Sequence, residues 1–133
     1  MAALAVARIA FEHNRMVLLV RVAAGPEACL GEAAAERLLA ARPTLRQHRC
    51  LNDEGLPFAA YLPRTSLPHV LEHLIIDYQV SDGKTVTDHT FVGTTEWLSP
   101  AEGLARVAVN FTDDLIALAA VKAALALLEG MVE

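Results

Sequence analysis

The sequence predicts an α+β fold: a two-layer sandwich of a roughly four-stranded, mostly antiparallel sheet with three helices, in the order ββααββα. Two observations support this class. Short β-branched runs occur in two pairs, one near the start of the chain and one in its second half. Ala- and Leu-rich stretches of helical composition separate and follow these pairs. The 133 residues suffice for one domain, 1–133, and are too few for two.

The first half of the chain is predicted to form a hairpin, a helix and a long connection. Residues 4–11 and 15–22 are β-compatible runs joined by a polar turn. Residues 26–41 are helical in composition, with a proline where a first turn tolerates it, and Arg42-Pro43 ends this helix. Residues 44–64 have no clear period, with at most a short strand. A connection of this length often carries a functional site or covers one.

The second half is predicted to form a helix, two strands and a final helix. The first of these helices starts at Thr65 or Ser66 and runs to about Val80, followed by a turn at 81–84. Residues 85–92 and 104–111 alternate in polarity, as strands do. The last helix covers 112–131, and acidic residues near its start favour its N-terminus.

Charge and composition exclude several classes of protein. A net charge of -5 argues against a nucleic-acid partner, because phosphate binding needs clustered Lys and Arg. No uninterrupted apolar run approaches the ~18 residues of a membrane span, so no membrane partner is expected. Residues 1–10 lack the basic start of a signal peptide, and the two cysteines form no CxxC, which favours a cytoplasmic protein. The Ala-rich helices make a homodimer plausible.

The strongest functional signal is the pentapeptide His69-Val70-Leu71-Glu72-His73, followed by Asp77. On a helix these four polar residues share an arc of about 140°. Two neutral imidazoles four residues apart are suited to bind Zn²⁺, with Asp77 as a third ligand. Glu72 would then lie beside the metal as a general base. The H-x-x-E-H order is the inverted form of a zinc-protease signature.

A second interpretation treats the same arc as a solvated helix face, since helices with two histidines and nearby carboxylates often bind no metal. The absence of Lys and Arg between Arg64 and Lys84 favours the metal site, because a fully exposed helix face usually carries them.

Other residues fit a substrate site less specifically. His48 is predicted to line the site, whereas Cys50 fits a small buried hydrophobe better. His89, on the predicted third strand, could face the pocket. Trp97 fits the core better than it fits a platform for an extended substrate. A substrate-binding edge or a plain surface turn would both explain the run Gly93, Thr94, Thr95 and Glu96.

Four segments together resemble the N-terminal domain of cyanophycin synthetases. They are 42–50 (RPTLRQHRC), 67–79 (LPHVLEHLIIDYQ), 104–111 (LARVAVNF) and 118–124 (LAAVKAA). In that family the domain is similar to a small zinc peptidase that nicks the polymer to make primers. The resemblance implies that His69 and His73 are ligands, that Asp77 takes the place of a ligand Glu, and that Glu72 is the catalytic base.

The chain departs from that family in two ways. It contains no ATP-grasp or Mur-ligase-like segment, so we expect no ATP-driven synthesis. A basic Gly-rich stretch that follows the helix in the family is here 92–97 (VGTTEW), which makes cyanophycin an expected poor substrate. Pitrilysin-type peptidases and S-ribosylhomocysteine lyases share H-x-x-E-H. The former take a distant downstream Glu as third ligand, and here the only acidic residues that far on are near the C-terminus. The latter need a downstream Cys ligand, and no Cys follows Cys50.

The sequence therefore predicts a zinc-dependent hydrolase that acts on a peptide or isopeptide bond in a peptide-like or polymeric substrate. The alternative is a binding module with the same fold that anchors a charged polymer or a protein partner without turnover.

Overall fold

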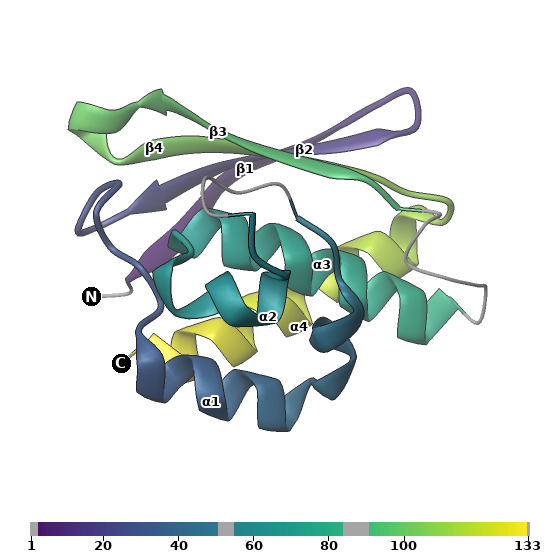
Figure 1. Ribbon diagram of the computed structural model, residues 1–133. Helices are drawn as coiled ribbons and strands as arrows, with labels where there is room; N and C mark the ends of the chain where they lie inside the picture. Colours follow the sequence, from purple (N-terminus) through teal and green to yellow (C-terminus); the bar gives the residue numbers. More distant parts are fainter. Residues whose placement is uncertain (1–2, 51–54, 84–90, 133) are drawn as a thin grey trace.

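The computed structural model describes residues 3–50, 55–83 and 91–132 and confirms the α+β class. Four antiparallel strands form one sheet in the order β1-β2-β4-β3. The strands are β1 (Leu4–Glu12), β2 (Arg15–Val22), β3 (Gly93–Ser99) and β4 (Leu104–Asn110). The helices are α1 (Glu32–Ala41), α2 (Phe58–Tyr61), α3 (Leu67–Gly83) and α4 (Asp114–Val132). All four helices lie on one face of the sheet (Figure 1).

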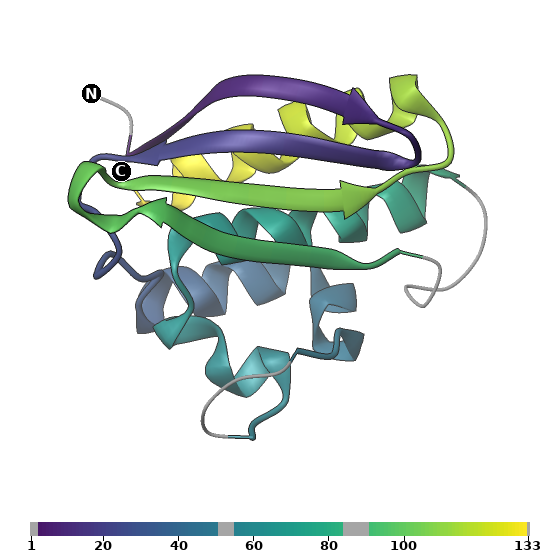
Figure 2. The same cartoon turned by 90° about the horizontal axis from the view of Figure 1, so that it is seen from above.

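The core lies between the sheet and the two long helices. Alternate residues of β2 point inward, because side chains of a strand face opposite sides in turn. Helix α3 lies beneath β3 and β4, and α4 runs beside it (Figure 2). The buried side chains that fill the space between them are Met16, Leu18, Val20, Val107, Val109, Val70, Leu71, Leu74, Ile75, Val121 and Leu128.

Helix α4 begins with a local cap and is unusually apolar. The Asp113 carboxylate accepts hydrogen bonds from the backbone N–H groups of Leu115 and Ile116, which are otherwise unpaired at a helix start. By length and composition alone, α4 is the one helix in the described ranges that could cross a membrane. A helix that packs in a protein core meets the same test. Leu115 at the start of this helix is 73% exposed. No contact with a second copy of the chain is described, so the homodimer stays a prediction.

Several predicted boundaries were wrong. The helix expected over 26–41 begins only at Glu32, because Gly31 adopts φ 88°, which a helix cannot continue through. The turn expected at 81–84 is helical through Gly83, where Ser81 donates a hydrogen bond to the Tyr78 carbonyl. The connection 44–64 holds α2 and two 3₁₀ turns, η1 (Pro43–Gln47) and η2 (Leu62–Arg64), in its described part.

Among the described residues, the third strand follows directly after the predicted range 85–92. Most of the predicted strand 85–92 falls outside the described residues, and Phe91 and Val92 are not in a strand. Strand β3 instead starts at Gly93 and pairs with β4. This position places the candidate substrate residues on an edge strand next to α3.

Candidate metal and hydrolase site

The predicted polar arc of α3 is buried rather than solvated. Helix α3 is covered by the sheet on one side, by α4 on another and by η1 on a third, so its polar residues face protein. Glu72, His73 and Asp77 are 5%, 4% and 3% exposed, and His69 is half-buried. Burial of polar groups is unfavourable unless they find partners, and these residues do find them.

Three donor atoms converge at the N-terminal half of α3. Cys50 Sγ lies 3.3 Å from His69 Nε2, which lies 3.2 Å from His73 Nε2. All three donor atoms lie within 4.8 Å of one another, so this group could hold a metal ion. The Phe58 ring stacks on His73 with centroids 3.7 Å apart and holds its plane. The structure thus brings His69 and His73 together with Cys50.

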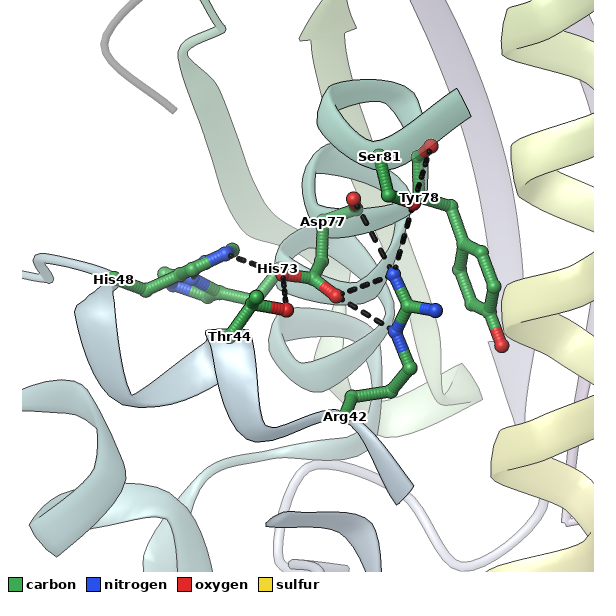
Figure 3. A network of polar contacts seen from close by, with 7 residues as sticks. All are labelled: Arg42, Thr44, His48, His73, Asp77, Tyr78 and Ser81. Atoms are coloured by element: carbon green, nitrogen blue, oxygen red, sulfur yellow. Dashed lines mark hydrogen bonds and ion pairs between the residues drawn. The ribbon is translucent and has the colours of Figure 1, made fainter. Parts of the chain in front are cut away.

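Asp77 lies on the same arc but is engaged elsewhere. Its carboxylate accepts hydrogen bonds from Arg42 Nε at 2.7 Å and from the Thr44 hydroxyl at 2.6 Å, and lies 3.2 Å from His48 Nε2 (Figure 3). Burial raises its pKa, but the hydrogen bonds from His48, Thr44 and Arg42 outweigh that effect and the pKa lies below the ordinary value. Asp77 is therefore not among the converging donors.

The protonation of the three donors suits a metal site. Burial lowers the pKa of His69, and it lowers that of His73 strongly, with help from the neighbouring histidines. Both rings are therefore neutral at neutral pH, as ligand imidazoles must be. Burial raises the pKa of the Cys50 thiol, and the nearby Glu72 charge adds to this. The thiol must therefore lose a proton when it binds a metal.

Glu72 is positioned by strand β3. The Thr95 hydroxyl donates a 2.7 Å hydrogen bond to Oε1, and Oε2 lies 3.9 Å from His73 Nε2. Gly93 lies directly against the carboxylate: a Cβ there would stand 2.6 Å from Glu72 Cγ and 2.8 Å from Oε2. Burial raises the pKa of Glu72, while the Thr95 hydrogen bond and the nearby His48 imidazole partly offset the rise. A raised carboxyl pKa suits a general base.

These groups line one cavity of about 400 Å³ between α3 and β3. The three donors, Glu72 and an arginine from the connection share it with the β3 edge. The lining residues are Arg49, Cys50, Ser66, His69, Glu72, His73, Gly93, Thr94, Thr95 and Trp97. Of the predicted substrate residues, Glu96 is not among them; it is exposed and pairs with Arg106 at 3.5 Å. His48 lines an adjoining hollow of about 260 Å³, and His89 lies outside the described residues.

Sequence reasoning undervalued two residues of this site. Cys50 was expected to be a small hydrophobe, and Trp97 was expected in the core. Both are partly buried against the core, and both also line the cavity. The signal for Cys50 was its place two residues after His48, in a segment that already resembled the family. Its distance of 19 residues from His69 gave no periodic hint.

A protein-family model described as the cyanophycin synthase-like N-terminal domain matches residues 29–133. The chain belongs to this family. The matched range starts after the β1–β2 hairpin and includes every residue of the cavity. A search of curated proteins found no match.

Proposed function

We propose that this member of the cyanophycin synthase-like N-terminal domain family is a zinc-dependent hydrolase of peptide or isopeptide bonds. The observation that carries the proposal is the convergence of Cys50 Sγ, His69 Nε2 and His73 Nε2 in the cavity that Glu72 faces. One thiol and two neutral imidazoles are a donor set that fits Zn²⁺ and leaves a position open. Zinc held there would polarise a scissile carbonyl and make water a better nucleophile.

Glu72 supplies the proton transfers in this proposal. The Thr95 hydroxyl occupies Oε1, so Oε2 is the oxygen that accepts a proton from the attacking water. The same oxygen then returns the proton to the leaving nitrogen as the C–N bond breaks. A carboxylate whose pKa is raised by burial is better matched to both steps than an exposed one.

The substrate is proposed to be an extended, charged, peptide-like chain that adds to the outer edge of β3. The Asn110 N–H donates to the Val92 carbonyl at 3.3 Å, which marks a hydrogen-bonded pair just before Gly93. Antiparallel pairs alternate, so the main-chain groups of Gly93 and Thr95 face the outer edge. A chain paired there would pass Glu72. The exposed Arg49 at the cavity would bind a carboxylate of the substrate.

The alternative function is a binding module that retains the cavity without turnover. The exposed Arg49 and the outer edge of β3 would serve such a module equally well. The two functions differ in whether Glu72 acts on a water molecule, so a variant at Glu72 discriminates between them.

The test uses tag-free protein, the wild type and Glu72→Gln. We expect one zinc per chain in both proteins by elemental analysis. The zinc-loaded wild type should cleave members of a mixed peptide library, read by mass spectrometry, and should cleave cyanophycin poorly, because one cavity arginine cannot pair its many carboxylates. Glu72→Gln should lose ~10²–10⁴-fold in rate. Zinc without cleavage would favour the binding module, and equal rates would exclude Glu72 as the base.

A further inference from the structure

A buried chain of polar contacts runs behind the donor cluster. His48 Nδ1 lies 3.0 Å from His73 Nδ1, and His48 Nε2 lies 3.2 Å from Asp77 Oδ1 (Figure 3). His73 and Asp77 are one helical turn apart on α3, while His48 follows η1. All three side chains are buried, with exposures of 6% or less. The contacts therefore reach from a carboxylate, through one imidazole, to the back of a proposed ligand.

The positions of the imidazole protons determine which group donates and which accepts in each of these contacts. A carboxylate has only acceptors, so His48 Nε2 must carry the proton of that contact. In a neutral imidazole the other nitrogen, Nδ1, then holds a lone pair. The contact between the two Nδ1 atoms therefore needs its proton from His73. With its single proton on Nδ1, His73 presents the lone pair of Nε2 to the side where Cys50 and His69 converge.

The far end of the chain is held firmly. The Asp77 carboxylate accepts hydrogen bonds from Arg42 and Thr44. The Arg42 guanidinium lies 4.0 Å from the centroid of the Tyr78 ring and donates a hydrogen bond to the Ser81 hydroxyl. Asp77 thus has a single orientation, in which Oδ1 faces His48.

We propose that His48 is a positioning residue which, together with Asp77, holds His73 in the tautomer with its proton on Nδ1 and its Nε2 lone pair directed into the donor cluster. Ligand histidines commonly pass their second N–H to a carboxylate or carbonyl. Here a second histidine is inserted between ligand and carboxylate. The affinity part of this inference rests on the proposed metal site, whereas the tautomer part does not.

The rival arrangement has His48 doubly protonated. Both of its nitrogens would then donate, His73 Nδ1 would accept, and the only proton of His73 would sit on Nε2. That proton would block the atom that the metal needs. The two arrangements place protons on different nitrogens, so they can be distinguished without any metal.

The first experiment reads the tautomers in the metal-free protein. Two-bond ¹H–¹⁵N correlations of ¹⁵N-histidine-labelled protein at neutral pH should show His73 protonated on Nδ1 and His48 protonated on Nε2. His73 protonated on Nε2, or His48 protonated on both nitrogens, would overturn the proposal. This measurement keeps its meaning even if the protein hydrolyses nothing.

The second experiment measures zinc affinity by competition with a chelator in three variants. His48→Leu removes the acceptor for His73 and should weaken zinc binding by roughly 10–100-fold. His48→Asn places an amide oxygen near the former Nδ1 and should restore most of the affinity. His13→Asn, on the exposed turn between β1 and β2, is the matched control and should bind as the wild type does.

The variants also separate positioning from packing. Wild-type affinity in His48→Leu, or equal losses in His48→Leu and His48→Asn, would overturn the proposal. Thermal unfolding checks that each variant folds. If His48→Leu does not fold, the tautomer measurement and the zinc affinity of His48→Asn test the proposal instead. A wild-type protein that binds no zinc would refute the proposed function, and the tautomers alone would then decide the role of His48.

Discussion

At the scale of single residues, the main question is whether Cys50 or Asp77 is the third metal ligand beside the two histidines. Asp77 and Cys50 both lie near the histidine pair, but Asp77 is already engaged by Arg42 and Thr44, whereas the Cys50 sulfur faces the same cavity as the two imidazoles. A thiolate ligand leaves a spectroscopic mark that a carboxylate does not. The choice between them can therefore be made without any substrate.

We expect cobalt(II)-loaded wild type to show thiolate-to-metal charge-transfer absorption in the near ultraviolet, and Cys50→Ser to lose it and to bind metal more weakly. Cys29→Ser, at the exposed cysteine outside the cavity, is the matched control and should keep the absorption, because the Cys50 sulfur is untouched. Since burial raises the pKa of Cys50, metal binding should release a proton and weaken as the pH falls. Charge-transfer absorption that persists in Cys50→Ser would remove Cys50 from the ligand set.

At the scale of elements, the site depends on how closely β3 approaches α3. Gly93 is the first residue of β3, and the Glu72 side chain occupies the space that any larger residue would need. Thr95, two residues on and on the same face of the strand, donates to the same carboxylate. The strand thus sets both the place and the hydrogen bonding of the proposed base.

Gly93→Ala should displace the Glu72 carboxylate, because the new Cβ would stand 2.6–2.8 Å from its atoms and the flexible side chain can move more easily than the strand. We expect the variant to fold and to bind zinc, with hydrolysis reduced toward the level of Glu72→Gln. Gly130→Ala on α4 is the matched control, because apart from the adjacent residues and the nearby backbone of α4 no atom lies within 4 Å of its added Cβ. Unchanged hydrolysis in Gly93→Ala would show that Glu72 needs no close contact with β3.

At the scale of the whole molecule, one polar cluster ties the outer helices to the central one. Arg42 follows α1, Thr44 lies in η1, and both donate to Asp77 of α3. Asp77 is 3% exposed, so the loss of its charge would leave these donors without a full partner. The cluster therefore contributes to stability only while the carboxylate is ionised.

Asp77→Asn should lower the free energy of unfolding at neutral pH by about 1.5–3 kcal/mol, the range for hydrogen bonds to charged groups. The folded-state pKa of Asp77 lies below its ordinary value of 3.8, so the contribution is complete above that value. This contribution is lost as the pH falls through the lower folded-state pKa. The difference in free energy of unfolding between the wild type and Asp77→Asn should therefore disappear there. Urea unfolding across this pH range measures this difference.

Glu96→Gln is the control for this comparison. Glu96 is 60% exposed and pairs with Arg106, and exposed pairs contribute little. Its effect should stay near zero at every pH. If the difference in free energy of unfolding between the wild type and Asp77→Asn stays constant at acidic pH, Asp77 stabilises the fold through its packing and not through its charge.

The sequence by itself determined the elements that depend on local pattern. The β1–β2 hairpin, the helix that carries His69, Glu72 and His73, and the last helix all follow from the spacing of apolar residues and from nearby caps. The arc shared by the histidines and Glu72 also follows from the helical period, because residues three and four apart must share a face.

Only the tertiary structure decided which partners meet that arc. Cys50 reaches His69 across 19 residues and Thr95 reaches Glu72 across 23, and no local period records such contacts. Pairing with β4, which is likewise not recorded in any local period, makes Gly93–Ser99 a strand of the sheet. The helical period brings the polar residues onto one face of α3. Packing against η1 and β3 then turns Asp77 toward Arg42 and leaves His69 and His73 facing Cys50. The reason is that each buried polar group must form its hydrogen bonds with the groups that the fold places beside it.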